Sequence, residues 1–380
     1  MRNAPADLRA FLNQLEREGE LIRISAEVDR DLEVAEIHRR VIAANGPALL
    51  FENVRGCGFP LVTNLFGTQR RVELAFGSRP GDLVRDVARL PEELMPPSLG
   101  KLWGKRSLFT QLARVGTKTK SSGPVLEVQE SRPALDRLPA LRTWARDGGP
   151  FLTLPLVLTH DPETGCPNLG MYASGLRADE VGVHMQIGKG GGFHLARAEE
   201  LGKALPVRIH LGGPPALILS AIAPLPENVP ELLLAVSPGV ASCPWPAIPT
   251  ASTRSSRPPS SSSAARSSPA RGAEGPFGDH YGYYSEVHDY PWMKVDRLLR
   301  RKDAIFPATV VGKPRQEDFY IGDFLQELLS PLFRWSCPRC ATSGRTETGY
   351  HALSAARVRE RYRREAMMSA FRILGEASSR

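Results

Sequence analysis

One stretch of this chain, residues 236–271, lacks the pattern that a folded core requires. It contains no Asp, Glu or Lys, yet it holds four arginines, a run of serines at 260–263 and many prolines, without apolar periodicity. Such a composition is typical of a disordered linker, or of an Arg/Ser tract that binds RNA. Because this stretch supplies no core, the fold must be assembled from the residues on either side of it.

A third interpretation of the stretch is a shifted reading frame in a GC-rich gene, since GC-rich codons read out of frame yield Ser, Arg, Pro and Ala. Back-translated into the neighbouring frame, residues 239–271 acquire a turn, apolar runs and strand-like alternation. Residues 334–345 and the end of the chain from Glu376 behave in the same way. The sequence therefore predicts two out-of-frame patches and a C-terminal truncation.

The bulk composition is that of a soluble globular protein. With 380 residues, 42% hydrophobic and 24% charged, the chain is long enough for two or three domains. We find no apolar run of bilayer length, no signal-peptide core and no disulfide framework among five cysteines, so we expect a cytoplasmic protein without a stable membrane span. The formal net charge is +8, and four arginines in residues 236–271 account for half of this excess. Because that stretch reads as out of frame, we expect no nucleic-acid partner.

The apolar patterns divide the chain into three parts. Residues 1–120 predict a small α/β lobe, with helices at 6–19, 32–44, 70–77 and 80–89 and strands at 21–24, 48–51 and 60–63. Residues 121–310 predict a β-barrel or sandwich, with strands at 151–159, 170–176, 181–187, 206–211 and 216–222 and a helix at 194–201. Residues 311–380 predict the start of a truncated α/β domain, with helices at 318–333 and 354–374.

A turn with two carboxylates, Glu274-Gly-Pro-Phe-Gly-Asp279, is the strongest candidate for chemistry. Gly and Pro fix a tight backbone path, so both carboxylates can face one cavity without belonging to a helix. Paired carboxylates in a dry pocket shift each other's pKa and can serve as acid and base. The alternative is an acidic surface turn.

Other motifs carry weaker signals. Cys337-Pro-Arg-Cys340 supplies only two metal ligands and lies inside an out-of-frame patch, so we expect no metal there. The loop Gly188-Lys-Gly-Gly-Gly192 could approach a phosphate closely, or could be a flexible turn. Asn168 and Glu231 carry oxygen ligands for a hard cation, although isolated residues of these types are more often caps or turns.

Taken together, the motifs resemble the UbiD-type decarboxylase family, the 3-octaprenyl-4-hydroxybenzoate carboxy-lyase-like enzymes that use prenylated FMN on aromatic and unsaturated acids. The resemblance covers nearly the whole chain outside the two patches and is carried by Leu8-Arg-Ala-Phe-Leu, Gly46-Pro-Ala-Leu-Leu-Phe-Glu-Asn-Val54, Asn64-Leu-Phe-Gly-Thr68, Asn168-Leu-Gly-Met-Tyr172, Leu211-Gly-Gly-Pro-Pro-Ala216 and Glu274 to Tyr284. It implies an α/β (α+β) fold, with a split β-barrel that binds flavin between α/β lobes.

The resemblance also implies roles for individual residues. Asn168, Glu231 and His184 would hold a divalent metal, usually Mn²⁺, against the cofactor phosphate, with K⁺ as a further candidate cation. Glu274 and Asp279 match the acidic members of a catalytic network, with Asp279 as the proton donor. The cofactor-binding positions are Met171, Tyr172, Ala173, Met185, Gln186, Ile187, Lys189 and Gly190.

The chain departs from the family pattern at Ala173, where the family has Arg, and residues 173–177 are one residue short. Without that guanidinium a substrate carboxylate lacks its bidentate partner and the acidic pair lacks charge compensation, and Arg177 cannot be assumed to replace it. A further, brief frame slip would explain both facts. We therefore expect weak or no activity from this polypeptide.

Three functional interpretations follow, with a decarboxylase first. By resemblance, it would act on a small aromatic or unsaturated acid, such as the 4-hydroxybenzoates of quinone biosynthesis, receive its cofactor from a flavin prenyltransferase, and assemble as a homo-oligomer. The second is a flavin-binding reductase on a similar barrel, which would consume NAD(P)H with plain FMN. The third is an RNA-binding or scaffold protein acting through residues 236–271; apart from Trp245, that stretch lacks aromatic residues to stack on bases.

Overall fold

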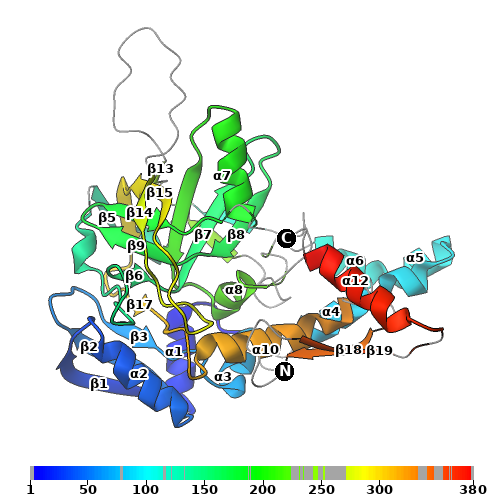
Figure 1. The fold of residues 1–380 in the computed structure, drawn as a ribbon, viewed down its shortest axis with the longest axis horizontal. Coiled ribbons are helices and arrows are strands. Elements are labelled where there is room, and N and C mark those ends of the chain that lie inside the picture. Colours follow the sequence, from blue (N-terminus) through cyan, green and yellow to red (C-terminus); the bar gives the residue numbers. More distant parts are fainter. Residues whose placement is uncertain are drawn as a thin grey trace, which may run out of the picture.

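The computed structural model describes residues 4–77, 80–113, 117–120, 122–131, 133–186, 188, 190–223, 231, 234, 243–246, 251–252, 271–332, 340–345, 354–358, 360 and 362–377. The molecule has a lower N-terminal lobe, an upper pair of β-sheets and a helical arm that projects to one side (Figure 1). Within these residues, no helix is both long and apolar enough to cross a membrane.

The N-terminal lobe is a four-stranded sheet flanked by helices. The strands lie in the order β1-β2-β3-β17, with bounds Leu21–Val28, Ala48–Val54, Leu61–Thr63 and Phe306–Pro307. β1 pairs with β2 in parallel, as expected for strands joined by a crossover helix, α2 (Glu33–Ala43). β17 lies more than 200 residues after β3 in the sequence and pairs with it in parallel, so residues distant in sequence complete the sheet of this lobe.

The helices of this lobe follow the predicted apolar spacing. α1 (Leu8–Arg17) buries Leu8, Phe11, Leu12 and Leu15, and its N-cap Asp7 accepts a hydrogen bond from the amide of Ala10. α3 (Gln69–Phe76) and α10 (Glu317–Leu329) contribute to the same core, which also includes β2 and β7 residues. One continuous core therefore joins the lobe to the upper sheets.

The upper part contains two antiparallel sheets. One has the order β14-β15-β10-β9-β6, with bounds Arg271–Glu274, His288–Lys294, Glu180–Val183, Ser174–Arg177 and Phe151–Leu152. The other has the order β13-β11-β7-β8, with bounds Ala251–Ser252, Pro206–Leu211, Pro155–His160 and Pro167–Met171. The expected α/β class is confirmed, and the described strands form these two sheets with no closed barrel detected among them.

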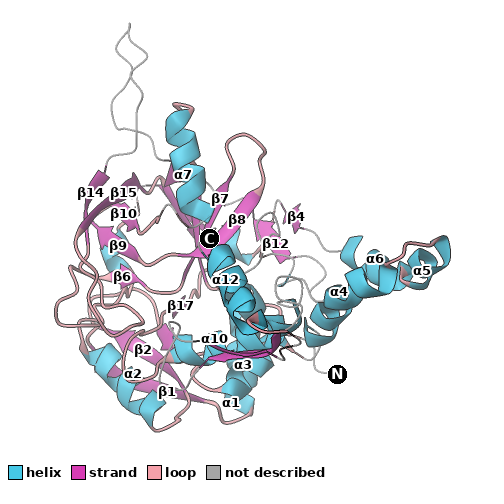
Figure 2. Ribbon diagram, turned by 45° about the vertical axis from the view of Figure 1, so that its right-hand side comes forward, coloured by secondary structure: helices cyan, strands magenta, loops and turns pink. Residues whose placement is uncertain are grey.

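α7 (Gly190–Glu200) packs on β7 and β8 and stands at the upper edge of the molecule (Figure 2). The strand expected at 216–222 is wrong, because this segment is the helix α8 (Pro215–Ser220). Pro214 and Pro215 supply a helix start, and all six residues of α8 are buried. A short apolar run without polar alternation fits a buried helix as well as a strand.

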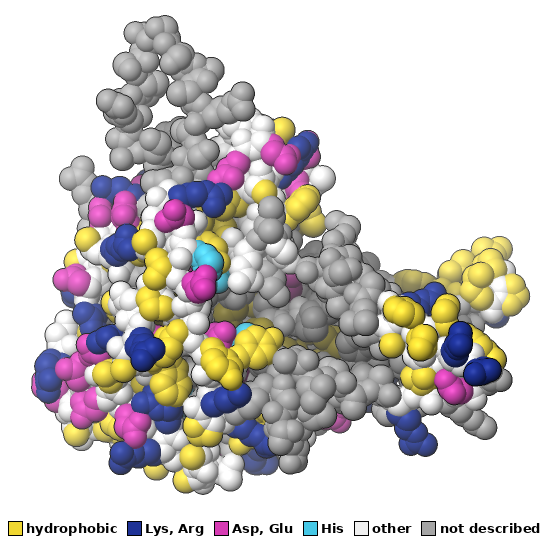
Figure 3. Space-filling view, viewed as in Figure 1, with side chains coloured by type: hydrophobic (Ala, Val, Ile, Leu, Met, Phe, Trp, Pro, Cys, Tyr) yellow, Lys and Arg dark blue, Asp and Glu magenta, His cyan; other side chains and the backbone are white. Residues whose placement is uncertain are grey.

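The arm consists of α4 (Pro80–Leu94), α5 (Leu99–Gly104) and α6 (Arg106–Ala113). Apolar side chains gather at its far end, where Leu99 and Trp103 are exposed (Figure 3).

The helix expected at 354–374 is wrong in its first part: β19 (Ser354–Val358) pairs with β18 (Cys340–Arg345), and α12 (Glu365–Ala377) follows.

The remaining short elements are two pairs of strands and three single turns of 3₁₀ helix. Two further pairs of strands are β12 (Cys243–Pro246) with β4 (Thr117–Lys120), and β16 (Arg297–Arg300) with β5 (Val128–Ser131). Three single turns of 3₁₀ helix cover Pro124–Leu126, Leu135–Arg137 and Ser330–Leu332.

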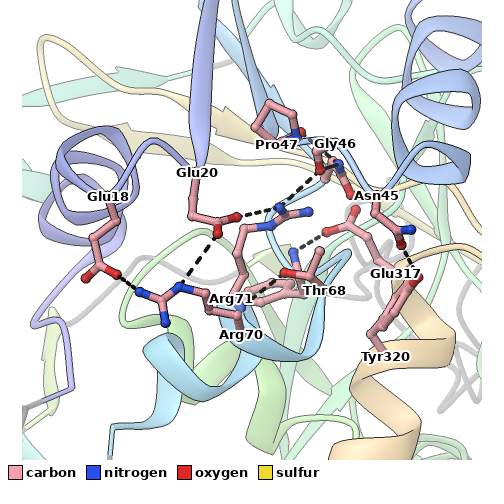
Figure 4. A network of polar contacts seen from close by, with 12 residues as sticks. Glu18, Glu20, Asn45, Gly46, Pro47, Thr68, Arg70, Arg71, Glu317 and Tyr320 are labelled. Carbon is pink, nitrogen blue, oxygen red and sulfur yellow. Dashed lines mark hydrogen bonds and ion pairs between the residues drawn. The ribbon is translucent and has the colours of Figure 1, made fainter.

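A buried polar network ties α10 to the N-terminal lobe (Figure 4). Glu317 is fully buried at the start of α10; its carboxylate accepts hydrogen bonds from the Phe66 amide at 2.7 Å and the Thr309 hydroxyl at 2.6 Å. Arg71, also fully buried, donates to Glu20 at 3.0 Å and to the Gly46 carbonyl at 3.1 Å. Burial raises the pKa of Glu317 to about 7, against the lowering effect of Thr309, Phe66 and Arg71.

The raised pKa of Glu317 makes stability depend on pH. Because the folded pKa lies above that of the unfolded chain, the carboxyl stabilises the fold at low pH, and this stabilisation is lost as pH rises through about 7. The facing groups are the Arg71 guanidinium and His38, whose Nε2 lies 3.9 Å from Glu317 and whose pKa burial lowers to about 3. His38 acts oppositely, since its buried neutral ring destabilises the fold as pH falls below its unfolded pKa.

In the wild type, we expect the free energy of unfolding to decrease between about pH 5 and pH 8, and we predict that Glu317→Gln abolishes this decrease. Urea unfolding of the full chain across this range measures it. Glu327→Gln, an exposed change on the same helix, serves as the control and should retain the wild-type pH profile. A Glu317→Gln profile that falls as steeply as the wild type would contradict the assignment.

Candidate active site

The Glu274–Asp279 turn leaves the sheet at the end of β14. Residues 271–274 pair with β15, with Glu274 opposite His288. Gly275 then adopts a φ of +96°, a left-handed conformation that a residue with a side chain adopts at a cost. The predicted tight turn is therefore present, and it turns the chain immediately after the Glu274 carboxylate.

Asp147 holds this turn in place from a distant loop. This carboxylate is 4% exposed, and one of its oxygens, Oδ2, accepts hydrogen bonds from the Thr143 amide (2.9 Å), the Thr143 hydroxyl (2.8 Å) and the Trp144 amide (2.8 Å). The other oxygen, Oδ1, accepts from the Gly278 amide at 2.8 Å, and the Gly148 amide donates to the Pro276 carbonyl at 2.8 Å. Two distant loops are thus joined through one buried anion.

Glu274 itself is 2% exposed. Its Oε2 lies 3.1 Å from Nδ1 of His184, whereas Oε1 is buried without a hydrogen-bond partner in the described part of the structure. An unmatched buried carboxylate oxygen is costly, so its presence indicates a site that another group completes.

His184 continues the network outward. Its Nε2 lies 3.0 Å from the Tyr290 hydroxyl and 3.2 Å from the Gln186 amide nitrogen, and its ring contacts that of Tyr290 with centroids 4.1 Å apart and planes tilted by 39°. Burial, and the negative charge of Glu274, raise the pKa of the Tyr290 hydroxyl, so Tyr290 stays protonated. Sequence reasoning missed Tyr290, because this residue lies outside every motif.

Asp279 does not share this network. Its carboxylate accepts hydrogen bonds from the amides of Tyr281 (2.9 Å) and Tyr283 (3.3 Å), as an aspartate does when it closes its own turn. Among the described residues, no hydrogen bond or ion pair links Asp279 to Glu274. The two carboxylates lie on one turn, as the sequence indicates, but they are not in contact.

A second cluster forms where β8 begins. The Oδ1 of Asn168 lies 2.1 Å from the position that a Cβ on residue 190 would take, so Gly190 permits this close approach. The Tyr172 hydroxyl accepts from the Gly191 amide (3.1 Å) and from Asn168 Nδ2 (3.4 Å). Glu231 accepts from the Leu169 amide at 3.2 Å, and burial raises the pKa of its carboxyl.

This cluster brings together Asn168, Glu231, Tyr172 and Gly190, but His184 makes its contacts with Glu274 instead. A second imidazole, that of His194 on α7, is 7% exposed and contacts the strand partner of Asn168. Its Nδ1 lies 2.9 Å from Oγ1 of Thr159, and Thr159 pairs with Asn168 across β7 and β8. Sequence reasoning missed His194, although its position just after the Gly-rich loop was a usable signal.

Arg177 does not replace the missing guanidinium at Ala173. Its guanidinium stacks on Trp292, 3.9 Å from the ring centroid, and donates to the Ala273 carbonyl. Trp292 packs closely on Gly182, where an added Cβ would come within 2.7 Å of the indole. Ala173 meanwhile accepts a backbone hydrogen bond from the His184 amide at 3.2 Å.

The remaining predicted cofactor residues are dispersed. Met185 is buried in the core, Met171 packs against a second core cluster, and Gln186 is exposed apart from its contact with His184. Ile187 and Lys189 lie outside the described residues. So does Cys337 of the CxxC pair, and no cluster of three or more His, Cys, Asp or Glu residues suited to a metal occurs among those described.

Family models identify the class of protein. The model of the 3-octaprenyl-4-hydroxybenzoate carboxy-lyase Rift-related domain matches residues 117–238 and 264–314, and the N-terminal domain model of the same family matches residues 12–90. An uncharacterized protein of Aquifex aeolicus is 35% identical over 382 residues, covering 97% of this chain and 78% of its own length. The chain belongs to the UbiD family of carboxy-lyases.

A named relative and two solved structures agree with this assignment. A Chlamydia pneumoniae protein, named as part of a 4-hydroxybenzoate decarboxylase, is 48% identical over 383 residues; the match covers 97% of this chain but 63% of that relative. Vanillic acid decarboxylase of Sedimentibacter hydroxybenzoicus shares the fold, with a TM-score of 0.78, 23% identity and coverage of 98% and 78%. The UbiD-class enzyme HmfF of Pelotomaculum thermopropionicum, in complex with prFMN, has a TM-score of 0.75, 21% identity and coverage of 98% and 84%.

We predict that Asp147→Asn destabilises the fold by about 2–4 kcal/mol, because an amide nitrogen would face backbone donors that now point at a carboxylate oxygen. Chemical denaturation of the full chain measures the loss. Asp136→Asn is the matched control, since Asp136 is exposed and should change stability by less than about 0.5 kcal/mol. Equal stability of the two variants would show that the Asp147 contacts do not hold the turn.

Proposed function

We propose that the protein represented by this chain catalyses the non-oxidative decarboxylation of an aromatic or α,β-unsaturated carboxylic acid with prenylated FMN. Membership of the UbiD family gives the reaction class. The single observation that carries the proposal is the Glu274 carboxylate, which is 2% exposed and keeps one oxygen without a partner among the described residues. A buried acid of this kind is suited to hold a proton for delivery to a carbon.

The second cluster fits the phosphate end of the cofactor. Asn168 and Glu231 offer oxygen ligands for Mn²⁺, and we propose His194 as the imidazole that joins them, in place of His184. Gly190, at the first turn of α7, lets Asn168 approach closely, and the start of a helix favours an anionic phosphate. When bound, prenylated FMN supplies the electron sink for the carbon that loses CO₂.

The finer assignments rest on the relatives. We propose a 4-hydroxybenzoate, as used in quinone biosynthesis, as the first substrate class to test, because a relative 48% identical is named as part of a 4-hydroxybenzoate decarboxylase. A flavin prenyltransferase would supply the cofactor in the cytoplasm, the intact protein would form a homo-oligomer, and K⁺ would be the second cation to assay beside Mn²⁺.

Decarboxylation of 4-hydroxybenzoate should depend on Glu274. Full chain co-expressed with a flavin prenyltransferase should bind the prenylated flavin, seen in its absorption spectrum, and release labelled CO₂ slowly, because Ala173 leaves the substrate carboxylate without a bidentate partner. Glu274→Gln should reduce release at least about 100-fold while retaining flavin. The exposed Glu286→Gln is the control. Consumption of NAD(P)H with plain FMN would instead favour a reductase.

The interrupted family match bears on the reading frame. The family model leaves residues 239–263 unmatched, within the stretch 236–271 that lacks a core pattern. We propose that this stretch, residues 334–345 and the run at Ala173 arise from single-base offsets. Sequencing the coding DNA should reveal such offsets near these positions; an uninterrupted frame would refute the idea and make Ala173 a true feature of the enzyme.

A further inference from the structure

Three side chains form a line from the buried end of β14 towards the surface. Glu274, on β14, is followed by His184, just beyond β10, and by Tyr290, on β15. These strands are adjacent in the sheet, in the order β14-β15-β10, so the sheet itself sets the spacing of the three groups. The carboxylate–imidazole distance is 3.1 Å and the imidazole–hydroxyl distance is 3.0 Å.

The contacts of His184 favour one tautomer of its ring. The Gln186 side-chain nitrogen, which can only donate, lies 3.2 Å from Nε2, and the Tyr290 hydroxyl lies 3.0 Å from the same atom. A carboxylate oxygen at Nδ1, which can only accept, and the Gln186 donor at Nε2 favour the tautomer with its proton on Nδ1, facing Glu274 Oε2. This is the arrangement by which a carboxylate orients an imidazole in a catalytic triad.

No guanidinium fills the place beside Glu274 among the described residues. Ala173 carries a methyl group, and Arg177 is held by Trp292 and the Ala273 carbonyl. A buried carboxylate must be matched by donors, and the donor present is His184. The Oε2 oxygen is thereby held, and Oε1 remains buried without a hydrogen-bond partner among the described residues.

We propose that His184 is the positioning residue of this site. Its Nδ1–H fixes Glu274 through Oε2 and leaves Oε1 as the reactive oxygen, a task that the methyl group of Ala173 cannot perform. Tyr290 and Gln186 hold the ring in this tautomer. The role in catalysis rests on the proposed decarboxylase function, whereas the tautomer does not.

The tautomer can be measured without cofactor. In the full chain labelled with ¹⁵N-histidine, His184 should show a protonated Nδ1 and an unprotonated Nε2, with its signals identified by their loss in His184→Asn. Tyr290→Phe should shift the signals towards a mixture of tautomers, whereas Tyr362→Phe, an exposed change far along the chain, should not. A proton on Nε2 in the wild type overturns the inference.

Two substitutions separate positioning from packing. An Asn side chain at 184 places an N–H donor near the position of Nδ1, whereas a Gln side chain places it near Nε2. We expect His184→Gln to lower kcat for labelled CO₂ release by about 100-fold with little change in KM, and His184→Asn to restore it to within about threefold. In an Ala173→Arg background, His184→Gln should lower kcat for CO₂ release much less, because the new guanidinium would take over the contact with Glu274.

The outcomes distinguish the two hypotheses. If His184→Asn loses as much kcat as His184→Gln, His184 does not position Glu274, and the inference fails while decarboxylation stands. If neither the wild type nor Ala173→Arg binds prenylated flavin or releases CO₂, the proposed function fails, and the Nδ1–H tautomer would still support the triad as built.

Discussion

The carboxylate of Asp147 is the interaction on which the site depends. Four hydrogen bonds converge on it, three from the 143–144 backbone and side chain and one from Gly278. A buried anion is tolerated when donors surround it, and here the donors belong to two loops far apart in sequence. The turn after β14 is therefore held at both ends, by the pairing of β14 with β15 and by Asp147, and Glu274 is placed between them.

The sheet then decides which groups meet Glu274. His184, just past the end of β10, reaches the Glu274 carboxylate on β14, and Tyr290 on β15, the strand between them, contacts the same imidazole. Asp279 lies beyond the turn, where its carboxylate binds the amides of Tyr281 and Tyr283. Glu274 is therefore the carboxylate of this turn with a buried oxygen that has no partner among the described residues, whereas the hydrogen bonds of Asp279 close the turn itself.

Local patterns predicted much of this fold, and long-range contacts explain the rest. The amphipathic spacing of α1 could be predicted, and the motif residues Asn168, Glu231 and Glu274 could be singled out as candidates, because each signal lies within a few positions of the chain. The contact of His184 with Glu274 could not be predicted, because nothing local links residues 90 positions apart. The helix at α8 was predicted as a strand because a buried apolar run has no polar face to reveal its period.

For the candidate site, residues 236–271 matter less than the single position 173. β14 still pairs in register with β15 after the interruption, and Glu274 is buried. At position 173, by contrast, the chain has a methyl group where the resemblance to the family implies a guanidinium, and among the described residues no hydrogen bond or ion pair joins Glu274 to an arginine. Under the proposed decarboxylase function, catalysis would therefore depend on how far the hydrogen bond from His184 substitutes for a guanidinium.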